Sequence, residues 1–134
     1  MGGFSIGSNL LGMRTSAFVE RSALACDALR ANFTSLVIEG DLGDMQTLKQ
    51  LHVHRGNDFL QITGGFPCQG FSSQGDQMGM EDHRSHSLTY ILQAAWFLRA
   101  DSVLLECVAN VVNFPCAQAC IDRTCIPPSR CLTY

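Results

Sequence analysis

The stretch FLQITGGFPCQGFS, residues 59–72, decides the fold. Its first part, Phe59 to Thr63, is apolar and rich in residues that favour β-strands, whereas Gly64, Gly65 and Pro67 suit neither a helix nor a central strand. A strand is therefore predicted to lead into a loop that carries Cys68. A cysteine in such a loop is a candidate nucleophile, although its spacing alone is more typical of a buried structural cysteine.

Strands and helices are predicted to alternate on both sides of this stretch. Helical spacing of apolar residues predicts one helix that ends near Asn32 and a second that contains Leu88, Ile91, Leu92 and Ala95. The predicted strands cover residues 17–19, 35–39 and 102–108. This order indicates an α/β fold with a mostly parallel sheet, in which ligands bind beyond the carboxyl ends of the strands. The residues at or near such ends are Glu20, Asp41, Cys68 and Glu106.

Composition limits the classes of function. The 134 residues carry a net charge of −3, which provides no overall basic field for a polyanion. No apolar run or signal pattern predicts a membrane span or export, so we expect an intracellular chain whose seven cysteines are reduced. His83 and His86 lack a third ligand and the cysteines after residue 114 lack a paired spacing, so no metal site is predicted. We expect one domain over residues 1–114 and an unpatterned tail over residues 115–134.

The motif GGFPCQGFS at residues 64–72 resembles the nucleophile motif of the C5-cytosine DNA methyltransferases, in which Pro-Cys-Gln carries the attacking thiol. Further matches follow the order of that family. Gly2 and Gly3 are similar to the last glycines of its cofactor loop, and Glu20 stands where its ribose-binding carboxylate is expected. Residues 106–108 are similar to the family's Glu-Asn-Val, with Cys107 in place of the asparagine.

The resemblance implies a partial Rossmann-like fold dependent on S-adenosylmethionine, with the first strand missing. It implies that Cys68 and Glu106 are catalytic, that Gln69 and Ser72 bind the substrate, and that DNA is the partner, with no membrane association. A nuclear location is expected if the organism is eukaryotic. The residues implied to bind S-adenosylmethionine are Gly2, Gly3, Phe4, Glu20, Arg21, Asp41, Leu42, Pro67 and Leu88.

The function predicted from these residues is methyl transfer to C5 of cytosine through a covalent Cys68 adduct, in a homologue that we expect to be inactive as this truncated chain. Two alternatives stay open at this point. One is a fragment of the family without catalysis, and the other is a small thiol-containing α/β binding module outside it. The sequence also leaves open the DNA context and the choice between DNA and tRNA.

Overall fold

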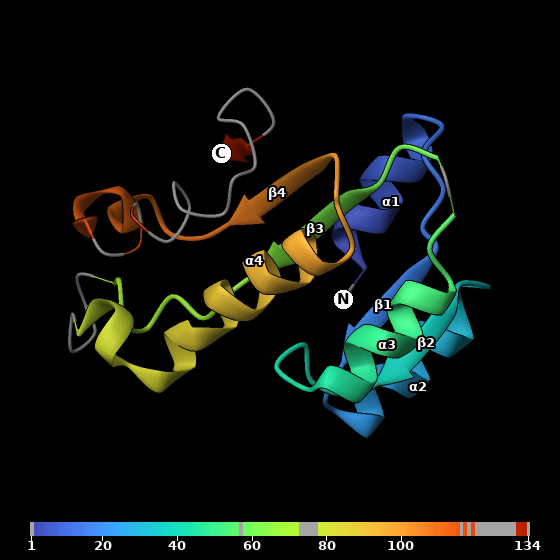
Figure 1. Ribbon diagram of the computed structural model, residues 1–134, viewed down its shortest axis with the longest axis horizontal. Helices are drawn as coiled ribbons and strands as arrows, with labels where there is room; N and C mark the ends of the chain where they lie inside the picture. The colour runs from blue at the N-terminus through green and yellow to red at the C-terminus, as the bar shows by residue number, and fades with distance from the viewer. Residues whose placement is uncertain are drawn as a thin grey trace. The chain divides into compact units, whose positions relative to one another are not determined.

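The computed structural model describes residues 2–56, 58–72 and 78–115, Ala117 and Ala119, and the backbone of residues 131–133. The chain divides into two compact units, Met1–Gly56 and Asn57–Tyr134, and each is described by itself. Figure 1 shows both units as mixtures of helices and strands. No helix within the described residues combines the length and the apolar character that a membrane crossing requires.

The first unit contains two parallel strands and three helices. Strand β1 pairs with β2 in a register that runs from Ala17 opposite Leu36 to Glu20 opposite Glu39. Helix α2 contacts both strands and buries Ala25, Cys26 and Leu29. The elements in chain order are α1 (Gly3–Leu10), β1 (Ala17–Glu20), α2 (Ala23–Asn32), β2 (Leu36–Glu39) and α3 (Met45–Val53).

Two of these helices, α1 and α3, were not predicted. Helix α1 begins after Gly2, whose φ of +83° is a conformation that glycine adopts readily. A Cβ atom on Gly2 would also lie 2.6 Å from the ring of Phe33. Helix α3 buries only Thr47 and Leu48, and the Asp44 side chain caps it by accepting a hydrogen bond of 3.1 Å from the backbone N–H of Gln46.

The second unit has a three-stranded parallel sheet in the order β3-β4-β5. Helix α4 lies alongside β3 and β4 (Figure 1) and buries Leu88, Ile91, Leu92, Ala94 and Ala95. The elements are β3 (Gln61–Gly65), the 3₁₀-helices η1 (Gly79–Glu81) and η2 (His83–Ser85), α4 (His86–Phe97), β4 (Ser102–Glu106), the 3₁₀-helix η3 (Ala109–Asn113) and β5 (Cys131–Thr133).

The predicted α/β architecture with parallel strands is confirmed, with shifts at the ends of elements. The strand predicted to begin at Phe59 begins at Gln61 and continues through Gly65, and the strand predicted to reach Val108 ends at Glu106. The described part of the stretch between β3 and α4 includes the two 3₁₀-helices η1 and η2.

The residues after Phe114 are only partly described. The predicted tail contains two parts that pack: Ala117 is fully buried, and the backbone of residues 131–133 pairs with β4. No apolar periodicity marks either segment, so the sequence carried no signal for them. The side chains of the tail cysteines Cys116, Cys120, Cys125 and Cys131 lie outside the described residues. The domain boundary at residue 114 stays a prediction.

Candidate active site

The loop after β3 presents Cys68 on a tight turn. The carbonyl oxygen of Cys68 accepts hydrogen bonds from the backbone N–H groups of Phe71 at 2.9 Å and Ser72 at 2.8 Å. These bonds reverse the chain directly after the thiol. Pro67 and Gln69, on either side of the cysteine, are exposed, whereas Cys68 is half-buried. The turn thus leaves the Cys68 thiol within reach of solvent at the carboxyl end of β3.

Aromatic packing anchors the far side of this loop. Phe71 is fully buried, and its ring makes edge-to-face contacts with Phe66 at 5.7 Å and Phe114 at 5.2 Å between centroids. The side-chain amide of Asn110 donates a hydrogen bond of 2.6 Å to the carbonyl oxygen of Phe71. Sequence reasoning missed Asn110, because its partner lies 39 residues away and no local pattern links the two.

Gly70 lies where the loop meets the two 3₁₀-helices. A Cβ atom at this position would lie 2.6 Å from Ser85 Oγ, 2.8 Å from the carbonyl oxygen of Gly79 and 3.1 Å from Asp82 Cβ. The carbonyl oxygen of Gly70 also accepts a hydrogen bond of 2.8 Å from the backbone N–H of Gly79. The loop can therefore pack this closely only with glycine at position 70.

An ion pair between Asp82 and Arg84 stabilises the segment under the loop. The Asp82 side chain is only 4% exposed, and it accepts hydrogen bonds from Arg84 Nε at 2.9 Å and Nη2 at 2.6 Å. These bonds, followed by the bond from the Arg84 backbone N–H, lower the pKa of Asp82 from 3.8 to about 2. The partner of Arg84 is thus a buried carboxylate.

Glu106 and Cys107 bring the end of β4 next to the Cys68 loop. Glu106 is paired in register with Gly65, and its Oε2 atom lies 3.0 Å from where a Cβ atom on Gly65 would be. Cys107 follows directly, and its thiol donates a weak hydrogen bond to the sulfur of Cys68 at 3.9 Å. The structure therefore brings the predicted pair Cys68 and Glu106 to the same edge of the sheet.

The thiol of Cys107 is a weaker acid than an ordinary cysteine thiol. Burial, followed by the negative charge on Cys68 and the hydrogen bond to Cys68, raises the pKa of Cys107 from 9.0 to about 12. Cys107 is consequently protonated near neutral pH and acts as a donor toward the Cys68 sulfur.

In the first unit, Glu20 and Asp41 lie at the carboxyl ends of the paired strands β1 and β2. Glu20 Oε1 accepts a hydrogen bond of 2.9 Å from the backbone N–H of Ser22, and no described donor bonds its Oε2 atom. Asp41 Oδ1 accepts from the backbone N–H of Gly43 at 2.8 Å, and Asp41 Oδ2 pairs with Arg21 at 3.2 Å. Half-buried Glu20 can therefore offer its Oε2 atom to a polar ligand.

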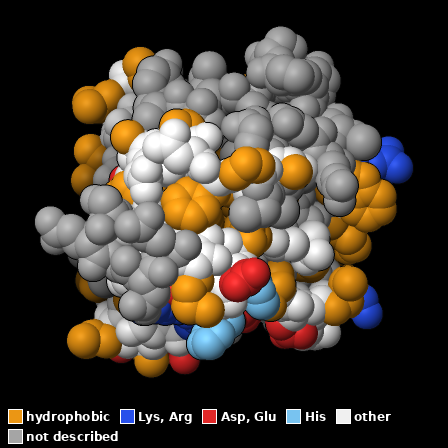
Figure 2. Space-filling model, turned by 90° about the vertical axis from the view of Figure 1, so that its left-hand side faces the viewer, with side chains coloured by type: hydrophobic (Ala, Val, Ile, Leu, Met, Phe, Trp, Pro, Cys, Tyr) orange, Lys and Arg blue, Asp and Glu red, His pale blue; other side chains and the backbone are white. Residues whose placement is uncertain are grey.

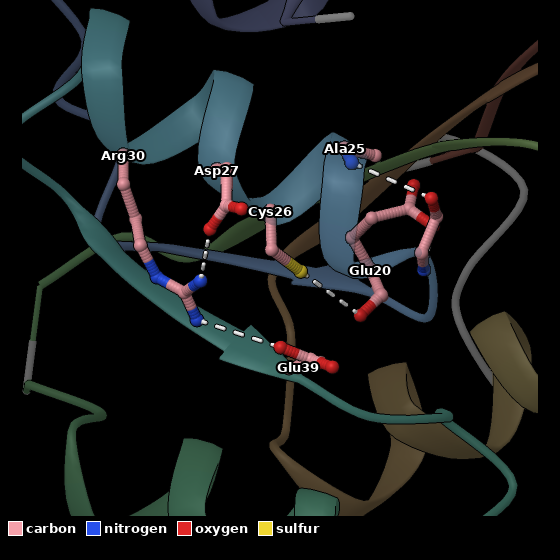
Figure 3. Close-up of polar contacts among 7 residues, drawn as sticks. Glu20, Ala25, Cys26, Asp27, Arg30 and Glu39 are labelled. Carbon is pink, nitrogen blue, oxygen red and sulfur yellow. Dashed lines mark hydrogen bonds and ion pairs between the residues drawn. The ribbon is translucent and has the colours of Figure 1, made fainter.

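The strand end beneath Glu20 is held by contacts drawn in Figure 3. The thiol of Cys26 donates to the Glu20 carbonyl oxygen at 3.4 Å, and burial raises the pKa of Cys26 above 9.0. Arg30 on the same helix pairs with Asp27 at 3.0 Å and with Glu39 at the end of β2 at 3.9 Å. These contacts tie α2 to the ends of both strands and fix the direction in which Glu20 leaves β1.

The remaining predicted residues lie in varied surroundings. Gly2, Gly3 and Phe4 form the start of α1, and Leu42 is half-buried just after β2. Leu88 is fully buried on α4, so it is a core residue of the second unit. Ser72 is half-buried. Within the described residues, no group of three His, Cys, Asp or Glu side chains is arranged to hold a metal ion.

Figure 2 shows the types of side chain on one face of the described residues. Hydrophobic side chains are visible there among polar atoms, acidic and histidine side chains lie near one another, and Lys and Arg occupy small areas of the described surface.

A pocket of about 390 Å³ in the first unit is lined by residues that include Arg14, Thr15, Asn32 and Ser35. These residues precede β1 and β2, so the pocket lies at the opposite ends of the strands from Glu20 and Asp41.

A family model of the C-5 cytosine-specific DNA methylases matches residues 1–120. The chain belongs to this family. Three similar proteins are type II methyltransferases. They are M.AquIA of Picosynechococcus sp., 31% identical over 121 residues, M.PspPI of Psychrobacter sp., 37% identical over 112 residues, and M.Eco47II of Escherichia coli, 30% identical over 113 residues.

Family membership rules out the interpretation of the chain as a thiol-containing module outside the family. The matches cover 88% of this chain for M.AquIA and 84% for each of the other two. The chain spans 49% of the length of M.AquIA and 26% of the length of M.PspPI and of M.Eco47II. All three relatives are bacterial, and they lend no support to a nuclear location.

Proposed function

We propose that this chain supplies the nucleophile and the cofactor-binding residues of a DNA cytosine-5 methyltransferase. The observation that carries the proposal is the Cys68 thiol, presented on a turn at the same sheet edge as Glu106, in a chain of the C-5 cytosine-specific DNA methylase family. The alternative within the family, a fragment without catalysis, has the same fold. It differs in predicting no chemistry at Cys68.

In the proposed reaction, a cytosine leaves the DNA stack because C5 and C6 cannot be reached inside the duplex. The Cys68 thiolate attacks C6, and Glu106 stabilises the proton or hydrogen bond at N3 while charge develops on the ring. S-adenosylmethionine, when bound, supplies the methyl group to C5. Loss of the C5 proton and elimination of Cys68 complete the transfer. Exposed Gln69 and half-buried Ser72 are placed on the Cys68 turn, where substrate contacts are expected.

The first unit offers groups that fit S-adenosylmethionine. The free Oε2 atom of Glu20 suits the ribose hydroxyls, since a carboxylate at a strand end can accept from both. Asp41 has lone pairs beyond its bonds to Gly43 and Arg21, and we assign it to the adenine amino group. Gly2, Gly3, Phe4, Arg21 and Leu42 complete the proposed cofactor set in this unit. Pro67 and Leu88 belong to the set by resemblance and lie in the second unit, where Leu88 is fully buried and can contribute only through packing.

The proposal is tested in a chimera, because the chain matches only part of each relative. Residues 1–120 replace the matched segment of the Psychrobacter protein, and methyl transfer from labelled S-adenosylmethionine to DNA is measured. We expect transfer that is lost with Cys68→Ser, because an alcohol is far less nucleophilic than a thiolate near neutral pH. Cys26→Ser is the matched control, since Cys26 is buried in the first unit and a serine hydroxyl can keep its hydrogen bond to the Glu20 carbonyl oxygen.

Covalent trapping gives the second readout. DNA containing 5-fluorocytosine should stall on the chimera with Cys68 bonded to C6, because fluorine cannot leave as a proton does. A folded chimera that transfers methyl groups equally well with Cys68→Ser, or that forms no adduct while turning over normal DNA, contradicts the assigned nucleophile. A folded chimera that neither transfers nor forms an adduct favours the fragment without catalysis.

A further inference from the structure

Two thiols lie in contact at the edge of the second unit. The sulfur atoms of Cys68 and Cys107 are 3.9 Å apart, and both residues are half-buried. We propose that Cys68 and Cys107 form a dithiol site that low-molecular-weight disulfides of the glutathione type oxidise to an intramolecular disulfide. Nothing in the methyl-transfer chemistry requires such a site, so the proposal goes beyond the proposed function.

The backbone around the two residues places them within reach of a disulfide. Neighbouring strands of a sheet lie roughly 4.8 Å apart, and β3 and β4 are paired up to Gly65 opposite Glu106. Cys107 is the next residue after that pair, and Cys68 stands three residues past it on a turn. A disulfide has its sulfurs about 2.05 Å apart, so the two must approach by roughly 2 Å. Both residues lie beyond the ends of the strands. Rotation about χ1 at these positions therefore does not break the hydrogen bonds between β3 and β4.

The oxidation proceeds by two thiol–disulfide exchanges. The Cys68 thiolate attacks one sulfur of the small disulfide, which forms a mixed disulfide at Cys68 and releases one thiolate. Cys107 then gives its proton to solvent and attacks the Cys68 sulfur, which forms the intramolecular bond and releases the second thiolate. The two protein thiols are oxidised, and the small disulfide is reduced to two thiols.

The environment of Cys107 sets the order of the two exchanges. The hydrogen bond between the sulfurs runs from Cys107 to Cys68, so Cys68 is the acceptor and the first attacking group. Burial is the largest cause that raises the pKa of Cys107, followed by the charge of Cys68 and the hydrogen bond to Cys68. The two contributions from Cys68 disappear when Cys68 becomes a mixed disulfide. Cys107 is therefore more easily deprotonated only after the first exchange.

Cys26 shows the contrast within the same chain. Its thiol is buried and donates to the Glu20 carbonyl oxygen, and it belongs to the first unit. Burial also raises its pKa, which disfavours the thiolate. Among the three cysteines whose side chains are described, only Cys68 and Cys107 have a thiol as a neighbour.

Oxidation at this site removes the thiolate that the proposed function needs. A sulfur held in a disulfide cannot attack C6, so the oxidised chain is inactive and a thiol reductant restores it. This consequence rests on the proposed function, whereas formation of the disulfide does not. The two are separated by an experiment that uses neither DNA nor S-adenosylmethionine.

The test maps disulfides in the whole chain after incubation with glutathione disulfide, alkylation of free thiols and digestion with trypsin. Cleavage after arginine places Cys68 alone in the peptide 56–84 and Cys107 in the peptide 100–123 with Cys116 and Cys120. We expect these two peptides to be linked in wild type and released by a thiol reductant. Cys116→Ser and Cys120→Ser are the matched variants and should keep the link.

Cys107→Ser gives the decisive comparison. It should abolish the link and raise the mixed disulfide at Cys68 at least tenfold over wild type, because no second thiol resolves it. Thermal melts of each variant show whether the fold is kept. A link that persists in Cys107→Ser overturns the proposal. So does a wild-type chain in which Cys68 remains unmodified, or carries glutathione without forming the link.

Discussion

Replacement of Gly70 by alanine tests the close packing beneath the Cys68 loop. The added Cβ atom would meet the Gly79 carbonyl oxygen at 2.8 Å and Ser85 Oγ at 2.6 Å, where an ordinary contact needs at least 3.4 Å. Neither neighbour can withdraw easily, since one is backbone and the other belongs to a fully buried side chain. Overpacking of this kind costs about 1–3 kcal/mol, and we expect the upper half of that range.

The assay is thermal unfolding followed by circular dichroism, with Gly65→Ala as the comparison in the same unit. A loss of about 2–3 kcal/mol should lower the midpoint by roughly 6–15 °C. At Gly65 the new Cβ meets only the Glu106 carboxylate and the Glu106 carbonyl oxygen, at 3.0 and 3.8 Å, and the carboxylate is an exposed and flexible group. Gly65→Ala should therefore unfold near the wild-type temperature. Equal midpoints for Gly70→Ala and wild type would refute the packing argument.

Three further outcomes are expected from the site. Asn110→Ala should destabilise the second unit by about 1–2 kcal/mol in urea titrations and speed hydrogen exchange in the loop, because the carbonyl oxygen of buried Phe71 loses its donor. Arg84→Met should raise the pKa of Asp82, measured by NMR titration, above its value of about 2. Because that pKa is depressed, the ion pair stabilises the fold above pH 3.8 and is lost as the pH falls toward 2, so Arg84→Met should flatten this acid dependence. The pH dependence of stability at Cys107 has the opposite sign. Its raised pKa favours folding below pH 9, and this stabilisation is lost between pH 9 and about 12. Cys107→Ser should remove that loss.

The predicted part of the fold is the part whose signal is local. Helices α2 and α4 have apolar residues at helical spacing, and β1, β2, β3 and β4 are short β-prone runs bounded by glycine or by charged residues. Helix α1 depends on the left-handed Gly2 and its contact with Phe33, and β5 depends on pairing with β4. Neither partner is visible within a short window of sequence.

The candidate site divides in the same way. Cys68 and Glu106 could be found because each ends a recognisable strand, and the parallel pairing brings them to one edge. Asn110 and the buried side of Asp82 could not be found, because their roles depend on distant backbone groups and on packing. The contact between Cys68 and Cys107 depends on the register between β3 and β4. Their last residues, Gly65 and Glu106, are 41 positions apart in the sequence and pair as neighbours.

The anchoring of the loop through Phe71 has a consequence for how descendants of this chain can change. Exposed Pro67 and Gln69 contribute little to the packed interior, so selection on them acts through the proposed reaction alone. Gly70 and Phe71 are buried, and selection on them acts through folding whether or not the reaction is still needed. A lineage that loses the activity and keeps the protein should therefore drift first at residues 67–69, while the two residues behind them stay as they are.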